Sequence, residues 1–175
     1  LLENIKKSEQ ISEKSDYNFI HGSGDIGVIA NGVSFGYARD AIQELGANIK
    51  ILRICFANPM PQKVVSDFLT GCKKVLIIEE GEPFMEEAVK AFAQEAAITI
   101  PINGKSDELF TRLYEYDPAM VRQKTAQYFG VDYTPKQKVD TADAPEVPMR
   151  PPNLCSGCSH RATFYEVQQA AKDMD

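Results

Sequence analysis

Two cysteines and a histidine near the carboxyl end of the chain have the residue types and spacing of half a metal site. Cys155 and Cys158 are separated by two residues, and His160 follows. A closed structural zinc site needs four ligands, whereas this turn supplies at most three. A redox pair is the alternative, because thiols close to a helix start ionise readily. We expect no metal in this chain by itself, and we interpret the turn as part of a cofactor or cluster site that a longer chain completes.

Five glutamates lie within the nine residues from Glu79 to Glu87, with no basic residue among them. A hydrolase with paired carboxylates needs a groove and an acid kept protonated by burial, and the sequence shows neither. Glu86 and Glu87 fall in the first turn of a predicted helix, where exposed amide groups favour negative charge. Glu82 and Pro83 fit the cap of that helix. We therefore expect helix-end electrostatics or an interface contact here.

The segment from Gly22 to Gly27 matches the G-x-G-x-x-G pattern of dinucleotide-binding loops. In such loops the glycines follow a full strand and open a helix. Here the third glycine leads into an apolar strand-like run instead. A turn therefore accounts for the pattern better than a nucleotide site does.

Short apolar runs alternate with stretches of helical periodicity up to about residue 102, which predicts an α/β fold with a largely parallel sheet. The runs are nearly continuous, as expected of strands covered on both faces. A first run, Tyr17–Ile20, ends a few residues before the next one, and so short a connection predicts an antiparallel hairpin. The predicted parallel strands are Val28–Ala30, Ile51–Cys55, Val75–Ile78 and Ala97–Ile100.

Helical spacing of apolar residues, together with prolines at starts and glycines at ends, defines the intervening helices. Within the third of them, Phe84, Ala88, Ala91 and Phe92 form the apolar side. The predicted helices are 33–45, 61–69, 84–96, 118–129 and 163–174. Five of the ten prolines lie in the stretch 131–153 amid polar residues, which indicates a linker. The last helix has nothing after it to pack against, so we expect a cut through a larger protein.

The composition is that of a globular protein: 43% of the 175 residues are hydrophobic, enough for a core without disulfides. The formal net charge of −6 argues against a nucleic-acid or anionic-membrane surface. No apolar run is long enough to span a bilayer, and the segment 1–16 is too polar for a secretory signal. The cysteine pattern indicates reduced intracellular thiols, so we expect a cytoplasmic protein.

Three stretches together resemble a known family. They are Gly27–Ala38 (GVIANGVSFGYA), Leu52–Pro61 (LRICFANPMP) and Val75–Glu86 (VLIIEEGEPFME). In this order they resemble the transketolase C-terminal-like domain of thiamine diphosphate-dependent 2-oxoacid:ferredoxin oxidoreductases. The tail Arg150–Arg161 (RPPNLCSGCSHR) is similar to the start of the diphosphate-binding domain in the large (alpha) subunit of indolepyruvate:ferredoxin oxidoreductase.

The resemblance implies a three-layer α/β/α sandwich whose mostly parallel sheet has one antiparallel strand. It implies four parts: a polar N-terminal segment (1–16), a transketolase C-terminal-like domain (17–130), a proline-rich linker (131–153) and the start of the diphosphate-binding domain (154–175). It also implies which residues bind cofactor in the full-length enzyme. These are Cys155, Gly157, Cys158, His160 and Arg161.

The family chemistry is the oxidative decarboxylation of aryl pyruvates such as indolepyruvate to aryl-acetyl-CoA, a reaction of anaerobic metabolism with ferredoxin as electron acceptor. Thiamine diphosphate with Mg²⁺ supplies the carbanion chemistry, and [4Fe-4S] clusters carry the electrons away. This chain lacks the pyrimidine-binding domain, the thiamine and magnesium motif and the cysteine-rich cluster domain. We therefore assign no catalytic residue and expect the isolated chain to be inactive.

The leading hypothesis is a non-catalytic scaffold or assembly domain of such an oxidoreductase. Its expected partners are the other domains of the same subunit, the partner subunit and ferredoxin, and a homodimer stays open. Two alternatives remain: an independent nucleotide- or small-ligand-binding α/β module, and a redox or zinc protein built on Cys155 and Cys158.

Overall fold

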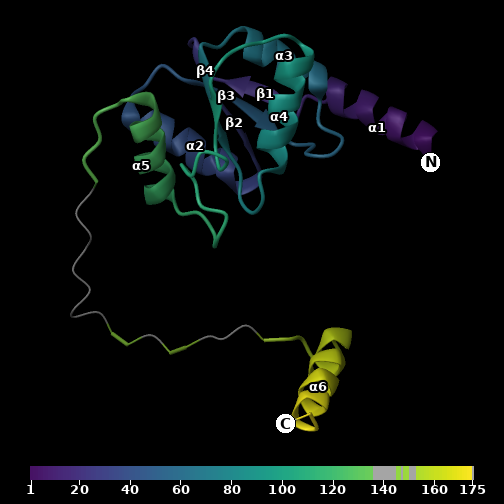
Figure 1. Ribbon diagram of the computed structural model, residues 1–175. Coiled ribbons are helices and arrows are strands. Elements are labelled where there is room, and N and C mark those ends of the chain that lie inside the picture. The colour runs from purple at the N-terminus through teal and green to yellow at the C-terminus, as the bar shows by residue number, and fades with distance from the viewer. Residues whose placement is uncertain (136–144, 147, 150–152, 175) are drawn as a thin grey trace. The chain divides into compact units, whose positions relative to one another are not determined.

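The computed structural model describes residues 1–135, 145–146, 148–149 and 153–174 (Figure 1). The chain divides into two compact units, Leu1–Lys136 and Gln137–Asp175. Most of the predicted linker, including Arg150 and the two prolines after it, lies outside the described residues. Within the described part, no helix is long and apolar enough to cross a membrane.

A five-stranded sheet forms the centre of the N-terminal unit, with the strand order β1-β3-β2-β4-β5. Strands β2 to β5 are parallel to one another, and β1 at the edge is antiparallel to β3. This arrangement confirms the predicted α/β class and its single antiparallel strand. The strands are β1 (Phe19–His21), β2 (Ile26–Asn31), β3 (Lys50–Ile54), β4 (Lys74–Ile78) and β5 (Ile102–Asn103).

The first strand pairs with a different neighbour from the one predicted. It is antiparallel, but it lies against β3, with Phe19 opposite Arg53, and makes no hairpin with β2. The connection passes close to the backbone that leads into β3: a Cβ on Gly24 would lie 2.3 Å from the Asn48 carbonyl oxygen. Gly24 also has φ +124°, which side chains strongly disfavour. The glycine turn therefore carries the chain past β3 and into the middle of the sheet.

The predicted strand Ala97–Ile100 is wrong. This run follows the helix that ends at Glu95, and the Ile98 amide donates to the Ala93 carbonyl at 2.8 Å. Ile98 and Ile100 pack on the core without joining the sheet. The strand forms two residues later, as β5. An apolar run can thus cover a core without pairing, and its composition alone does not distinguish the two roles.

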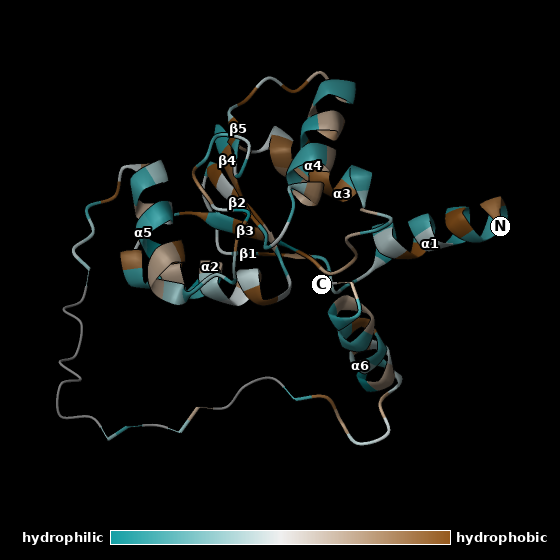
Figure 2. Ribbon diagram, turned by 60° about the horizontal axis from the view of Figure 1, so that its bottom comes forward, coloured by the Kyte–Doolittle hydropathy of each residue, from teal (hydrophilic) through white to brown (hydrophobic). Residues whose placement is uncertain are grey.

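Two helices cover each face of the sheet, which gives the three layers predicted (Figure 1). Helices α2 and α5 pack on the face that carries Val28 and Ile51, whereas α3 and α4 pack on the face that carries Ile29 and Leu52. Figure 2 shows hydrophobic strands running between the helix layers. The helices of the unit are α1 (Leu2–Lys14), α2 (Gly32–Leu45), α3 (Gln62–Thr70), α4 (Phe84–Glu95) and α5 (Pro118–Phe129).

The polar N-terminal segment, for which the sequence predicted no structure, forms helix α1. Its last turn is fixed to the body, because the Glu13 carboxylate accepts hydrogen bonds from the amides of Lys63 (2.8 Å) and Val64 (3.3 Å). Glu13 thereby supplies acceptors at the N-terminus of α3, whose N-cap residue is Pro61. The first turns of α1 carry apolar residues (brown in Figure 2), of which Leu2 and Ile5 are exposed.

The C-terminal unit contains helix α6 (Ser159–Lys172), which buries none of its side chains among the described residues. Its exposed apolar residues include Phe164, Tyr165 and Val167.

Two glycine substitutions test the packing of the sheet on α3. A Cβ on Gly27 would lie 2.8 Å from both the Cys72 sulfur and the Phe68 ring, so Gly27→Ala should lower the free energy of unfolding by about 1–3 kcal/mol. A Cβ on Gly36 in α2 meets nothing within 4 Å, and Gly36→Ala should raise stability by about 0.5–1 kcal/mol. Urea unfolding of both variants measures this. Equal stability of the two would contradict the packing of Gly27 described here.

Candidate functional site

The carboxylate of Glu79, directly after β4, lies at the N-terminus of α4. It is 5% exposed and accepts hydrogen bonds from the amides of Met85 (2.8 Å) and Glu86 (2.9 Å). The N-cap residue of α4 is Pro83, which has no side-chain acceptor, so Glu79 caps the helix in its place. Burial raises the pKa of Glu79, and the two amides only partly oppose this effect. The predicted helix-end electrostatics is therefore confirmed. The residue that caps the helix is Glu79, however, and not Glu82, which the sequence placed in the cap.

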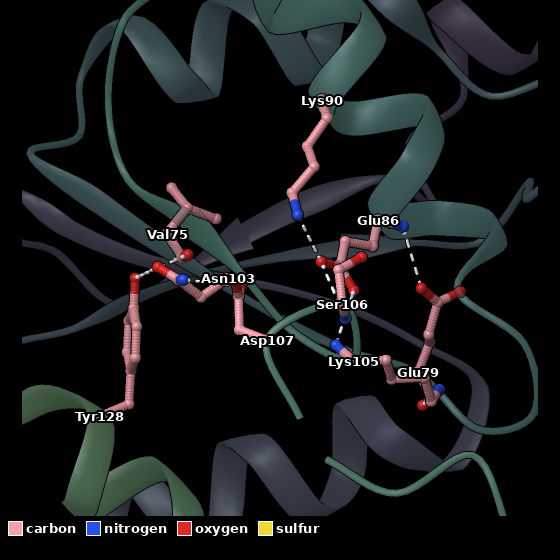
Figure 3. A network of polar contacts seen from close by, with 9 residues as sticks. All are labelled: Val75, Glu79, Glu86, Lys90, Asn103, Lys105, Ser106, Asp107 and Tyr128. Atoms are coloured by element: carbon pink, nitrogen blue, oxygen red, sulfur yellow. Dashed lines mark hydrogen bonds and ion pairs between the residues drawn. The ribbon is translucent and has the colours of Figure 1, made fainter. Parts of the chain in front are cut away.

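Glu86, in the first turn of α4, is completely buried although it carries a carboxylate. It accepts hydrogen bonds from the Lys90 ammonium (2.7 Å) and from the backbone amides of Lys105 (2.6 Å) and Ser106 (3.2 Å). Figure 3 shows these bonds converging on one side chain. Burial alone would raise the pKa of Glu86, but the bonds from Lys90, Ser106 and Lys105 together lower it. The carboxylate thus joins α4 to the segment after β5.

Gly104 makes this contact possible. A Cβ at that position would lie 2.6 Å from Glu86 Oε2 and 3.3 Å from Ile77. The backbone can approach the buried carboxylate this closely only because glycine has no side chain.

Lys105 is also buried, at 4% exposure, and its ammonium group donates to the carbonyl oxygen of Glu79. The same group lies 5.2 Å from the centre of the Tyr116 ring. Burial lowers the pKa of Lys105, whereas the carboxylates of Glu79 and Glu86 oppose that change. The Tyr116 amide donates to Glu80 at 2.8 Å. Glu79 and Glu80, which directly follow β4, and Glu86 in α4 therefore hold residues 104–116 at the carboxyl end of β4.

Tyr128 of α5 contacts Asn103, the last residue of β5, and the neighbouring strand β4 (Figure 3). Its hydroxyl lies 3.1 Å from the Val75 carbonyl oxygen and 2.9 Å from Asn103 Oδ1, and Asn103 donates in turn to Asp107 at 2.7 Å. Burial raises the pKa of Tyr128 to about 12, so the hydroxyl remains protonated at neutral pH.

Shifted pKa values often mark catalytic groups, but here each shifted group at this edge has a structural partner. Glu79 caps a helix, Glu86 binds two backbone amides, and Lys105 binds a carbonyl. Sequence reasoning missed Lys105, because nothing in its local pattern indicates burial. What this network does chemically is to fix a loop.

The carboxyl edge of the sheet also carries a groove. Strands β2 and β4 are neighbours, yet the chain leaves them toward opposite faces, into α2 and α4, and ligands of open α/β sheets bind at such points. A cavity of about 970 Å³ lies there, and it is lined by Asn31 at the end of β2, Met60 after β3 and Phe84 after β4, among other residues. One wall is formed by α1.

The residues that the resemblance assigns to cofactor binding lie on one turn of the C-terminal unit. The Cys158 amide donates to the Cys155 carbonyl at 3.1 Å, and Gly157 between them has φ +78°. Cys158 is the N-cap residue of α6, its sulfur lies 3.4 Å from His160 Nδ1, and its carbonyl accepts from the Arg161 amide at 3.1 Å. Among the described residues, no group of three or more His, Cys, Asp and Glu side chains is placed to hold a metal ion.

Solved structures with a similar fold define the class of the α/β unit. A split-gene transketolase, described as an inactive beta4 tetramer, matches with a TM-score of 0.51 at 13% identity, over 67% of this chain and 44% of that chain. The 2-oxoglutarate:ferredoxin oxidoreductase from Magnetococcus marinus, with 2-oxoglutarate, coenzyme A and succinyl-CoA bound, matches with a TM-score of 0.50 at 21% identity. It covers 69% of this chain and 21% of that one. The fold is therefore transketolase-like.

Curated relatives identify the protein family more specifically than the fold does. Indolepyruvate oxidoreductase subunit IorA of Methanothermobacter marburgensis is 36% identical over 99% of this chain, and that of Pyrococcus horikoshii is 38% identical over 98%. The chain is thus homologous to a segment of indolepyruvate oxidoreductase subunit IorA, which confirms the resemblance. It spans 28% and 27% of the lengths of these two relatives. No family model matches the chain.

Glu86→Gln tests the role of the buried carboxylate. The amide keeps an acceptor but loses the ion pair with Lys90 and turns an NH₂ group toward backbone donors, so the free energy of unfolding should fall by about 2 kcal/mol. Glu87→Gln, at the exposed neighbouring position, is the matched control and should change it by less than about 0.5 kcal/mol. Denaturant unfolding at neutral pH measures both.

The difference in unfolding free energy between the native protein and Glu86→Gln should depend on pH. Because the folded-state pKa of Glu86 lies below its ordinary value of 4.5, its stabilising effect is complete above that pH and disappears as the pH falls through the folded value. The difference between the native protein and Glu86→Gln should therefore shrink in acid. A difference that stays constant from neutral pH into acid would contradict the assignment.

Proposed function

We propose that this chain is a non-catalytic scaffold and assembly segment of an indolepyruvate:ferredoxin oxidoreductase. The complete enzyme would decarboxylate aryl pyruvates oxidatively to aryl-acetyl-CoA and pass the electrons to ferredoxin. The sequence identity of 36–38% with subunit IorA over nearly the whole chain supports the choice of this enzyme. We further propose that the enzyme acts in the cytoplasm, where thiols stay reduced.

One observation gives the main support for the proposed scaffold role. The buried ionisable groups at the carboxyl edge, where an α/β enzyme normally places its reactive groups, are bound to the protein's own backbone. Glu79, Glu86 and Lys105 hold a helix end and a loop. Carboxylate oxygens that already accept such bonds are less available to take a proton from a substrate.

We propose the same division of the chain as the motifs predict. Residues 17–130 are the transketolase C-terminal-like domain, with 1–16 before it, 131–153 as linker and 154–175 as the start of the diphosphate-binding domain. In support, the first compact unit ends near residue 136, and α6 buries no side chain within the part of the chain that the structure describes.

The cysteine turn fits only part of a cofactor site. Two thiols and one imidazole are fewer than the four ligands of a closed metal site, and the turn contains no carboxylate for Mg²⁺. When bound to the complete enzyme, thiamine diphosphate supplies carbanion chemistry and iron-sulfur clusters supply electron transfer. We propose that the turn, through Cys155, Gly157, Cys158, His160 and Arg161, lines that region. The other domains of the subunit, a partner subunit and ferredoxin would complete the assembly.

The isolated chain should neither bind thiamine diphosphate tightly nor turn over indolepyruvate, because it offers no complete site for a diphosphate and its metal. Isothermal titration calorimetry with thiamine diphosphate and Mg²⁺ measures the binding directly. Micromolar affinity would show that the chain holds a cofactor site of its own, and the scaffold role would then be wrong.

A chimera tests the proposal in an active enzyme. This chain would replace the homologous segment of the Methanothermobacter marburgensis subunit, and we expect activity to be retained. Glu86→Gln in the chimera should lower the yield of assembled enzyme but leave kcat per assembled enzyme within about twofold, since the residue acts on folding. Cys158→Ser should instead change the cofactor content or kcat. A large loss of kcat from Glu86→Gln in fully assembled enzyme would contradict the scaffold role.

A further inference from the structure

The groove at the carboxyl edge has an apolar floor. Met60, Phe84 and Phe92 line it, together with small apolar residues of the β3–α3 loop and α4. Phe84 is 80% exposed, although helical spacing predicted it on the buried side of α4. The buried side consists of Met85, Glu86, Val89 and Ala93 instead. Because Glu86 must reach the backbone after β5, the helix is turned so that Phe84 faces the groove.

The rim of the groove is acidic. Glu9 and Glu13 contribute from α1, and Glu80 and Glu82 contribute from the segment after β4. Lys14 is the only basic side chain in the described lining. Glu13 and Glu80 bind backbone amides within the chain, and Glu82 pairs with Arg112 at 3.3 Å on the surface. Glu9 is exposed and makes no side-chain bond within the described residues. Glu79, which is 5% exposed, also belongs to the lining, so carboxylates outnumber basic side chains beside the apolar side chains of the groove.

We infer that this groove binds a segment of a partner protein in which lysine or arginine residues flank leucine-like or aromatic side chains. The apolar floor would take the hydrophobic side chains, and the rim would attract the cations. The same rim repels phosphates and carboxylates, so nucleotides, coenzyme A and 2-oxoacids do not fit. A volume of about 970 Å³ is at the upper end of small-molecule pockets, which run to about 1,000 Å³, and this favours a peptide segment over a small cation.

This inference is independent of the proposed function, since it follows from the shape and charge of the groove. The position of the groove supports it. The floor and one rim belong to elements fixed by the Glu79 and Glu86 bonds, and the α1 wall is fixed through Glu13. A preformed groove loses little conformational entropy when it binds a peptide.

The test uses the whole chain and a fluorescein-labelled amphipathic peptide of leucine and lysine, with fluorescence anisotropy as readout. The charge-inverted peptide of leucine and glutamate is the control for the probe. Phe84→Ala should weaken binding of the lysine peptide about tenfold, which corresponds to the loss of about 1.4 kcal/mol. Glu9→Gln should weaken it about twofold to threefold and reduce its salt dependence.

Matched control variants distinguish binding in the groove from non-specific attraction of the peptide to the acidic surface of the protein. Tyr114→Ala removes an aromatic ring that is 90% exposed outside the groove, and Glu3→Gln removes an acid of α1 outside the groove. Neither should change the affinity. Because Phe84 is also exposed, its replacement should leave the circular dichroism spectrum and the thermal midpoint unchanged.

Three results would overturn the inference. The first is that the lysine peptide does not bind. The second is that the control variants weaken binding of the peptide as much as the groove variants do. The third is that spermine displaces the peptide and binds with an affinity that Phe84→Ala leaves unchanged. The last result would make the groove a site for small cations.

Discussion

The buried carboxylate of Glu86 is the interaction on which the carboxyl edge of this protein depends. An ionised group without water is costly unless it is fully bonded, and Glu86 meets this condition with one ammonium group and two backbone amides. Those bonds fix the rotation of α4 and the path of the chain after β5. Removing any partner would leave a buried charge or a buried amide unsatisfied.

Several features of the fold were predictable because local rules determine them. The apolar runs Val28–Ala30 and Val75–Ile78 are strands, and Asp117 caps α5 with bonds of 2.8 and 2.9 Å to the amides of Ala119 and Met120. Proline at the start and Gly130 at the end bound the same helix. In each case the signal lies within a few residues of the structure that it specifies.

The features that were not predictable depend on contacts between distant residues. Phe19 pairs with Arg53 across the sheet, and nothing near residue 19 indicates that partner. The side of α4 that faces the core was misassigned because a buried glutamate has the pattern of a surface residue. Glu79 caps a helix that begins five residues later, and Glu13 caps one that begins about fifty residues later. The spacing of Cys155 and Cys158 predicted one local turn, which the structure shows, whereas the role of this turn in cofactor binding stays a prediction.

The carboxyl edge combines two uses of negative charge. Buried carboxylates at Glu79 and Glu86 stabilise the framework, and Glu79 also belongs to the lining of the groove, where Glu9 and Glu82 are exposed. Under the scaffold role that we propose, the first use holds the framework together and the second offers a surface for a partner. The proposed scaffold role requires both a rigid edge and a site for a neighbour, and helix α4 contributes to the rigid edge and to the lining of the groove.

Amide hydrogen exchange of Lys105 and Ser106 tests the central claim most directly, because their amides donate to Glu86. If the buried carboxylate holds the loop, these two amides should exchange as slowly as those of β4, and Glu86→Gln should remove most of that protection while the amides of β3 keep theirs. Exchange of Lys105 and Ser106 as fast as in an exposed loop of the native protein would contradict the account, since Glu86 would then be free for another role.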